Sequence, residues 1–285
     1  MKAYTKVLFW FLAVLITMFS FVYQRMTGPT YPVRGSVEIN DQEIGYSLIR
    51  SYDGDSDAPV EINVPDEDIK GTFKYKRYPS YDEWVADSLV RDGNTLIAYI
   101  PHQPAAGKVK YLITIHYSGK STDLTEEPVI IRFRDPVPTW AIIPHVLFMF
   151  FAMVLSARAG IEAITKGGGI RWLTYASLIT LIIGGLVFGP IMQKFAFGEY
   201  WTGWPLGTDL TDNKTAVAFI FWVIAAIAVW KNPKHCTWVI VAAVVTLIIY
   251  LIPHSLLGSE IDFTEKEQMQ DKVGYIVESF SCLKS

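Results

Sequence analysis

The sequence predicts a membrane all-α bundle of five transmembrane helices with an inserted extracytoplasmic all-β Ig-like sandwich. Hydrophobic residues make up 51% of the 285 positions, and they are concentrated in five runs rather than spread along the chain. Between the first and second runs lies a segment of short β-branched and aromatic stretches separated by turn residues. Such runs are typical of polytopic membrane proteins, and turn-separated stretches of this kind are typical of strands.

Composition and motifs exclude several classes of function. A formal net charge of -3 gives no basic surface for nucleic acid. The two cysteines, Cys236 and Cys282, stand in different contexts and form neither a disulfide framework nor a CxxC pair, so redox chemistry would need a bound cofactor. The sequence has no Walker loop, nucleophile elbow, HExxH or dinucleotide-binding glycine pattern, so it gives no support for a hydrolase or an ATPase. Whether the protein is an enzyme stays open.

Residues 1–25 are expected to form an N-terminal signal-anchor helix. Lys2 and Lys6 precede an uncharged apolar run from Val7 to Val22. The chain then continues SFVYQRM without a small-x-small cleavage motif, so we expect an uncleaved helix with its N-terminus inside. A cleaved secretory signal is the alternative.

Residues 34–135 are predicted to form the extracytoplasmic sandwich. Turn signals such as Asp92-Gly93-Asn94 and Ser118-Gly119-Lys120 separate the strand-like stretches. Six or seven short strands in a segment of this length favour an Ig-like arrangement. The expected strands are Ile44–Tyr52, Val60–Val64, Gly71–Arg77, Thr95–Ile100, Val109–Tyr117 and Val129–Phe133.

Residues 138–258 are expected to supply a four-helix transmembrane domain, and residues 259–285 a polar C-terminal tail. We expect Gly189-Pro190 to end the second helix of this domain, because proline disrupts a helix interior. Arg158 and Glu162 stand four residues apart and are predicted to form an ion pair. The expected spans are Trp140–Ala157, Leu173–Ile191, Ala216–Trp230 and Cys236–Leu257.

Lysine and arginine residues near the ends of the spans indicate the orientation. Seven of them would lie on one side of the membrane and four on the other, and the richer side is expected to be cytoplasmic. The protein is therefore expected in the cytoplasmic (inner) membrane, with the β-domain, the loop before the fourth span and the C-terminus on the extracytoplasmic side. The seven are Lys2, Lys6, Arg158, Lys166, Arg171, Lys231 and Lys234, and the four are Arg25, Arg34, Lys194 and Lys214.

That loop, residues 197–214, reads FGEYWTGWPLGTDLTDNK and is called the Trp/Asp loop below. It is longer and more polar than a connection between two spans requires. It concentrates Trp201 and Trp204 with the carboxylates Asp209 and Asp212. Asp209 and Asp212, together with Asn213, are candidate oxygen ligands of calcium or another hard cation, and the alternative is that Asp212 or Asn213 caps the following helix.

His145 and His254 are the main candidates for cofactor ligands. Each follows a proline and lies about one turn inside the outer end of a span, and the two spans run in opposite directions. An ionisable residue within a span is a candidate for function, and imidazole is a common ligand of haem and metals. Met149 follows His145 by four residues and could add a thioether ligand. The alternatives are histidines bonded to a carbonyl that proline has freed, and a methionine that only packs.

The stretch Gly198-Glu199-Tyr200-Trp201-Thr202-Gly203-Trp204-Pro205 with Asp209 resembles the tryptophan-rich WWD loop of membrane proteins that handle haem in cytochrome c biogenesis. The resemblance implies that Trp201 and Trp204 lie against haem and that His145 and His254 are its axial ligands. It covers about twenty residues. The chain departs from that family in its interrupted Trp-Asp core, its five expected spans and its N-terminal β-domain.

We therefore expect an integral membrane protein whose outer-face site binds haem b or a metal for electron transfer or cofactor handling. A quinone could occupy the same apolar site. The alternative is a non-catalytic membrane subunit or scaffold whose β-sandwich binds an envelope partner. The expected partners are the lipid bilayer and an envelope or membrane protein, with no nucleic acid.

Overall fold

The computed structural model describes residues 3–232, 236–253, 258 and 260–264. The chain divides into two compact units, each assembled from two separate segments. The helical unit comprises Met1–Tyr31 and Pro136–Ser259, and the β unit comprises Pro32–Asp135 and Glu260–Ser285.

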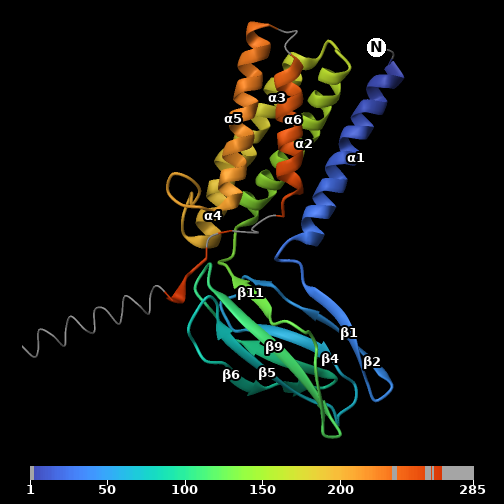
Figure 1. The fold of residues 1–285 in the computed structure, drawn as a ribbon, viewed down its shortest axis with the longest axis vertical. Coiled ribbons are helices and arrows are strands. Elements are labelled where there is room, and N and C mark those ends of the chain that lie inside the picture. The colour runs from blue at the N-terminus through green and yellow to red at the C-terminus, as the bar shows by residue number, and fades with distance from the viewer. Residues whose placement is uncertain (1–2, 233–235, 254–257, 259, 265–285) are drawn as a thin grey trace, which may run out of the picture. The chain divides into compact units, whose positions relative to one another are not determined.

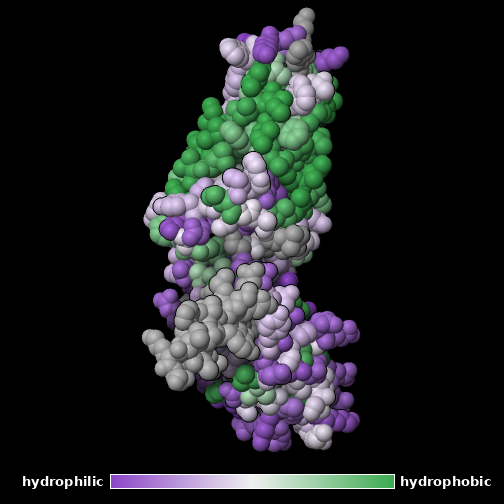
Figure 2. Space-filling model, turned by 60° about the vertical axis from the view of Figure 1, so that its left-hand side comes forward, coloured by the Kyte–Doolittle hydropathy of each residue, from purple (hydrophilic) through white to green (hydrophobic). Residues whose placement is uncertain are grey.

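The helical unit contains four helices, among the described residues, that are long and apolar enough to cross a membrane. They are α1 (Ala3–Thr27), α2 (Thr139–Ile164), the continuous helix Ile170–Phe197 and α5 (Leu210–Lys231). A fifth apolar helix, α6 (Cys236–Leu251), has 16 residues. Figure 2 shows a wide band of hydrophobic side chains on the surface of the helices that Figure 1 labels. These lengths and this band indicate a membrane protein.

The helix Ile170–Phe197 runs through Pro190, where the sequence led us to expect its end. It consists of α3 (Ile170–Leu181), the π-helical segment η1 (Ile182–Phe188) and α4 (Gly189–Phe197). Pro190 has no N–H for the carbonyl four residues earlier, and a π-helical turn shifts the hydrogen-bond register by one residue. The helix therefore continues past Pro190, which lies in the first turn of α4 directly after the widened segment η1. The prediction that Gly189-Pro190 ends this helix was wrong.

Small residues bring the helices of this unit close together. A Cβ on Gly160 of α2 would lie 2.8 Å from Cβ of Ala243 in α6, so only glycine fits there without a shift. Trp222 of α5 is buried and donates its indole N–H to Thr246 of α6 at 2.8 Å. Close packing of small residues and buried polar links between helices are typical of membrane bundles.

The described part of the β unit contains eleven strands in three sheets, more than the six or seven strands expected. A two-stranded sheet pairs β1 with β2, a six-stranded sheet has the order β3-β11-β9-β5-β6 with β10 on β9, and a three-stranded sheet has the order β4-β8-β7. The strands that the sequence did not predict are mostly short. The strands are β1 (Val33–Ile39), β2 (Gln42–Leu48), β3 (Ser51–Tyr52), β4 (Ala58–Asn63), β5 (Lys70–Arg77), β6 (Val85–Ser88), β7 (Val90–Asp92), β8 (Thr95–Ile100), β9 (Lys108–Tyr117), β10 (Lys120–Asp123) and β11 (Val129–Phe133).

Tight turns with left-handed residues set the register of the hairpins. Asn40 and Asp41 join β1 to β2 with φ of 54° and 58°. Ser118 and Gly119 join β9 to β10 with φ of 47° and 78°. Two-residue loops with two positive φ angles match the twist of the flanking strands. The predicted turn at Ser118-Gly119-Lys120 is therefore where the chain reverses.

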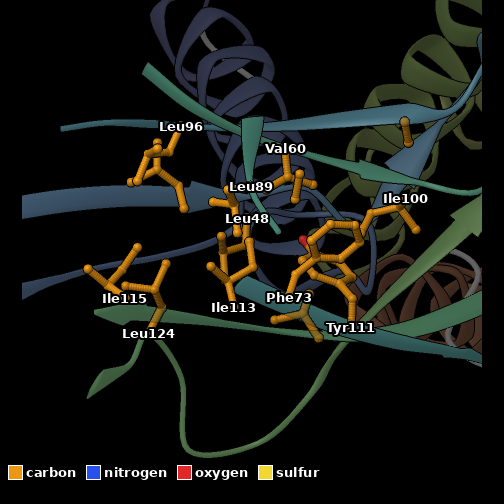
Figure 3. Close-up of a cluster of buried hydrophobic side chains, with 14 of the residues drawn as sticks. Leu48, Val60, Phe73, Leu89, Leu96, Ile100, Tyr111, Ile113, Ile115 and Leu124 are labelled. Atoms are coloured by element: carbon orange, nitrogen blue, oxygen red, sulfur yellow. The ribbon is translucent and has the colours of Figure 1, made fainter. Parts of the chain in front are cut away.

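One hydrophobic core serves all three sheets of the β unit. Leu48 of β2, Val60 of β4 and Phe73 of β5 belong to the same cluster of buried side chains, as Figure 3 shows. Tyr111 of β9 is fully buried in this cluster, and its hydroxyl donates to the carbonyl oxygen of Ile49 at 2.8 Å. The alternation of buried side chains along β9 is the period-two pattern expected of a strand that faces a core.

The segment of residues 260–264 packs onto the β unit. The backbone N–H of Ile261 donates to Ala106 at 3.2 Å, and that of Phe263 donates to Pro79 at 3.1 Å. Phe263 is buried, and the guanidinium of Arg77 lies 4.7 Å from the centre of its ring. Two stretches far apart in the sequence thus complete one folded unit.

Candidate functional site

His145 lies on α2 and is fixed by the π-helical segment. Its Nδ1 is 2.9 Å from the carbonyl oxygen of Gly184 in η1. Because a carbonyl can only accept, Nδ1 carries the proton, and a neutral ring then presents Nε2 as a lone-pair donor. The alternative of a histidine bonded to a backbone carbonyl is therefore correct for Nδ1, but proline has not freed this carbonyl, because the carbonyl oxygen of Gly184 also accepts the N–H of Gly189.

Gly184 lets η1 approach α2 closely at this level, and Gly185 and Gly189 lie in ordinary contact with the same face of α2. A Cβ on Gly184 would lie 2.9 Å from the backbone nitrogen of Met149, and a Cβ on Gly185 would lie 3.5 Å from its sulfur. A Cβ on Gly189 would lie 3.8 Å from Cε1 of His145. His145 and Met149 therefore face the same widened stretch of helix, as their i, i+4 spacing predicts.

Met149 also connects α2 to α6. The hydroxyl of Tyr250 donates to the carbonyl oxygen of Met149 at 2.8 Å and lies 3.9 Å from its sulfur. Its sulfur packs between Tyr250 and Gly185. Tyr250 was not predicted from the sequence, because a lone tyrosine in an apolar run gives no sign of its partner.

Asp212 organises the Trp/Asp loop from within the first turn of α5. One carboxylate oxygen, Oδ2, accepts from the backbone N–H groups of Thr202 at 2.7 Å and Gly203 at 3.0 Å. Next to it, Oδ1 of Asn213 accepts from the N–H of Trp204 at 2.7 Å. The side chain of Gln193 in α4 donates to the Thr202 hydroxyl at 2.5 Å. These bonds fold the loop back onto the helices on both sides of it.

The cap of α5 is Asp209, three residues earlier than expected. Its Oδ1 accepts from the N–H of Thr211 at 2.7 Å, which is the usual geometry of an aspartate N-cap. The helix begins at Leu210 rather than Ala216, so Asp212 and Asn213 bind the loop and not the helix end. The expectation that one of those two residues caps the helix was wrong.

Lys214 joins the base of the loop to the end of α6. Its side chain is 7% exposed, and its ammonium lies 3.3 Å from the carbonyl oxygens of both Ile252 and Pro253. A cation is favourable at the carbonyl end of a helix, where unpaired carbonyls carry partial negative charge. The residues that lead into His254 are thus held beside the first turn of α5, while His254 itself lies outside the described residues.

The two tryptophans of the loop have different surroundings. Trp201 is half-buried and donates its indole N–H to the carbonyl oxygen of Trp204 at 3.2 Å. Trp204 is 78% exposed, as is Leu206. The described contacts bring Trp201, Trp204 and Asp212 together in the loop. Those of His145 and Met149 lead instead to η1 and α6.

Within the described ranges, no three His, Cys, Asp or Glu side chains lie close enough to hold a metal ion. Haem needs fewer ligating side chains than a bare metal ion, because the porphyrin nitrogens already bind the iron and the protein supplies only one or two further ligands. Comparisons of the chain with protein-family models, with curated proteins and with solved structures found no match.

Proposed function

We propose that the helical unit is a haem b-binding membrane domain that takes part in electron transfer or cofactor handling, with His145 and His254 as axial ligands. The observation that carries the proposal is the bond from Nδ1 of His145 to Gly184. Histidines that bind metals usually donate their second ring nitrogen to a carbonyl or carboxylate, which fixes the ring and raises its basicity. Nε2 of His145 is the nitrogen that would bind the iron.

The packing of α6 on α2 supports a second ligand from the chain that follows α6. The two helices run in opposite directions in Figure 1, and Tyr250 bonds to Met149 between them. Tyr250 precedes His254 by four residues, and Met149 follows His145 by four. α6 ends at Leu251 and His254 lies outside the described residues, so the choice of His254 rests on its position in the sequence, three residues after the end of α6. When bound, haem would supply a one-electron redox centre.

Both segments of the β unit must lie on one side of the membrane, and this supports five spans. Residues 260–264 bond to the same β unit that contains residues 32–135. An even number of crossings must therefore separate the two segments, so α6 is needed as a span in addition to α2, Ile170–Phe197 and α5. The core shared by the sheets supports an Ig-like arrangement. The Lys/Arg count supports placing the β unit outside the inner membrane.

The Trp/Asp loop would contribute the aromatic cover of the site. Its likeness to the WWD loop of haem-handling proteins rests on Trp201, Trp204 and Asp209. The hydrogen bonds that Asp212 and Asn213 accept from backbone N–H groups hold that loop in one conformation, which favours a binding surface over a plain connector. A bound metal ion or quinone would be detected by elemental analysis and by lipid extraction of the same preparation.

The test is a reduced-minus-oxidised absorption spectrum of the full-length protein, purified in detergent after expression with ample haem. A Soret band with α and β bands is expected in the wild type, and its loss in both His145→Ala and His254→Ala. His102→Ala, an exposed histidine in the β unit, is the matched control and should keep the bands. A flat wild-type spectrum would refute the proposal.

A second candidate is a non-catalytic subunit that docks a membrane or envelope partner. The observation favouring it is the exposure of Trp204 and Leu206, each 78%, at the tip of a loop held by hydrogen bonds. Exposed aromatic anchors on rigid loops are typical of binding surfaces. In that case, Trp204→Ala should abolish co-purification of the partner while any absorption bands stay unchanged.

A further inference from the structure

A polar cavity of about 720 Å³ lies at the end of the helical unit that contains the start of α1 and the α2–α3 connection. Its walls include Lys6 and Trp10 of α1, Arg158 and Glu162 of α2, and Trp172 of α3. Arg158 follows His145 by thirteen residues on the same helix, which corresponds to about 20 Å along the axis. The cavity is therefore separate from the candidate haem site.

Arg158 belongs to the wall of this cavity, and within the described part of the chain two of its buried N–H groups have no partner. It is 4% exposed, and Nη2 lies 2.5 Å from Oε2 of Glu162, so the predicted ion pair is confirmed. Among the described residues, Nε and Nη1 of Arg158 have no hydrogen-bond partner. The rings of Phe9 and Trp10 lie 5.7 and 5.5 Å from the guanidinium carbon. A buried donor without a partner is costly, so these two N–H groups indicate an absent acceptor.

The connection after α2 adds a second cation. The N–H of Gly167 donates to Glu162 at 2.9 Å and that of Lys166 to Ala163 at 3.3 Å, which is the pair of bonds of a Schellman motif. Lys166 occupies the left-handed position of this motif with φ of 52°. Glycine or asparagine is usual at that position, so a lysine there is unfavourable for the backbone. Lys166 belongs to the cavity wall.

The charges of the cavity favour an anion. Three cations, Lys6, Arg158 and Lys166, face one carboxylate, Glu162, which is already bound by Arg158 and by the N–H of Gly169 at 3.0 Å. Arginine with lysine is the usual combination for phosphate oxygens. We propose that this cavity binds the phosphate group of an anionic membrane lipid.

A lipid is favoured as the source of the phosphate because the cavity lies at the ends of apolar helices. Trp10 and Trp172 have ring centres 6.4 Å apart, and Trp172 is 55% exposed. Tryptophan is enriched where membrane helices meet the headgroup layer. Basic pockets between helix ends at that level suit anionic headgroups. Soluble phosphate offers the same oxygens without acyl chains, so one arm of the test separates the two sources.

The test uses full-length protein in detergent and follows its thermal unfolding while phosphatidylglycerol, phosphatidylcholine or inorganic phosphate is added. Ligands that bind the folded state raise the unfolding temperature by mass action. We expect half-saturation at a lower concentration of phosphatidylglycerol than of phosphatidylcholine, and little effect of inorganic phosphate. Native mass spectrometry should find one phosphatidylglycerol retained per chain.

Glu162→Gln should increase the affinity for phosphatidylglycerol. A misfolded variant would lose affinity, so misfolding cannot explain an increase. Glutamine keeps the oxygen that accepts from Gly169 but removes the negative charge and releases Arg158. Apparent affinity for phosphatidylglycerol should rise about fivefold, and it should fall about fivefold in Lys6→Gln and in Lys166→Asn, as expected for one charge near an anionic lipid. Asparagine at 166 suits the left-handed backbone, so the fold is preserved.

Lys231→Gln is the matched control, because it removes one charge at the end of α5 from a residue outside the cavity wall. Its affinity should equal that of the wild type. Equal affinities for the two lipids, or no gain in Glu162→Gln, would overturn the proposal. If inorganic phosphate raises the unfolding temperature as much as phosphatidylglycerol does, and if Glu162→Gln strengthens this effect, the phosphate bound by the cavity does not come from a lipid. None of these outcomes depends on haem.

Discussion

His145 and Gly184 are joined by a 2.9 Å hydrogen bond from Nδ1 to a carbonyl oxygen. The acceptor belongs to the π-helical stretch η1, next to Gly185 and shortly before Pro190. The orientation of the imidazole on α2 thus depends on the shape of another helix, and substitutions in η1 should affect the ring without touching it.

Gly184→Ala should disturb the candidate haem site. The new Cβ would lie 2.9 Å from the backbone nitrogen of Met149 and 3.0 Å from Cβ of Phe148, so one helix has to shift. Overpacking of this kind costs about 1–3 kcal/mol. We expect a lower unfolding temperature and less retained haem, measured by absorbance per mole of purified protein. Gly168→Ala is the control, since a Cβ there meets nothing within 4 Å, and an equal loss in both variants would contradict the prediction.

Asp212→Ala should release the Trp/Asp loop. It leaves the N–H groups of Thr202 and Gly203 without their carboxylate acceptor, and each bond of this charged kind contributes about 1.5–3 kcal/mol. Hydrogen exchange at these two amides should become at least tenfold faster. Glu199→Gln, an exposed carboxylate in the same loop, should leave both rates unchanged. Unchanged exchange in Asp212→Ala would show that the loop is held by other contacts.

The pair Arg77–Asp82 should make the stability of the β unit depend on pH. Arg77 binds both carboxylate oxygens at 2.6 and 2.7 Å, and this hydrogen bonding lowers the pKa of Asp82 below its ordinary value. A depressed folded pKa means stabilisation that is complete above the unfolded value, about pH 4, and is lost as the pH falls through the folded pKa. Because the pair is partly exposed, its contribution at pH 7 should be only about 0.5–1 kcal/mol.

Denaturant unfolding of the full-length protein and of Asp82→Asn, from pH 7 down to pH 3, checks this dependence. The difference between the two proteins should shrink towards zero at the acidic end. Asp53→Asn breaks the more exposed ion pair with Arg134 and should change stability less. A difference that stays constant over the whole pH range would contradict the linkage.

Tyr111→Phe should weaken the core of the β unit by about 1 kcal/mol, the usual net value of one hydrogen bond. The hydroxyl of Tyr111 donates to the carbonyl of Ile49, and phenylalanine fills the same space without it. Burial also raises the pKa of Tyr111 far above that of an ordinary tyrosine. In a titration followed at the tyrosinate absorption band, the folded wild type and Tyr111→Phe should therefore show the same number of ionising tyrosines.

Local sequence patterns predicted much of the fold. Apolar runs indicated the helices, turn residues such as Ser118-Gly119 indicated a hairpin, and the spacing of Arg158 and Glu162 predicted their ion pair. The expected strand Ile44–Tyr52 divides into β2 and β3, and β3 pairs in parallel with β11. Such long-range pairing depends on residues far apart in the chain, so it leaves no local signature.

The candidate site was less predictable because its geometry depends on contacts between elements. Pro190 signals a break, yet the helix continues through η1 and α4, and the carbonyl oxygen of Gly184 accepts both the N–H of Gly189 and Nδ1–H of His145. Asp212 resembles a helix cap in the sequence, but the helix begins earlier and its carboxylate binds the loop. The preference of aspartate for helix ends depends only on the local segment. It cannot show whether the carboxylate binds the N–H groups of the helix end or those of the loop.

Residues 260–264 lie along the β unit, and Phe263 is buried there beside Arg77. This segment is synthesised after α6, whereas the strands that it covers are synthesised before α2. Part of the surface of the β unit therefore stays uncovered until residues 260–264 have been made. The β unit completes its fold late in synthesis, although its strands are among the first segments of the chain to be made.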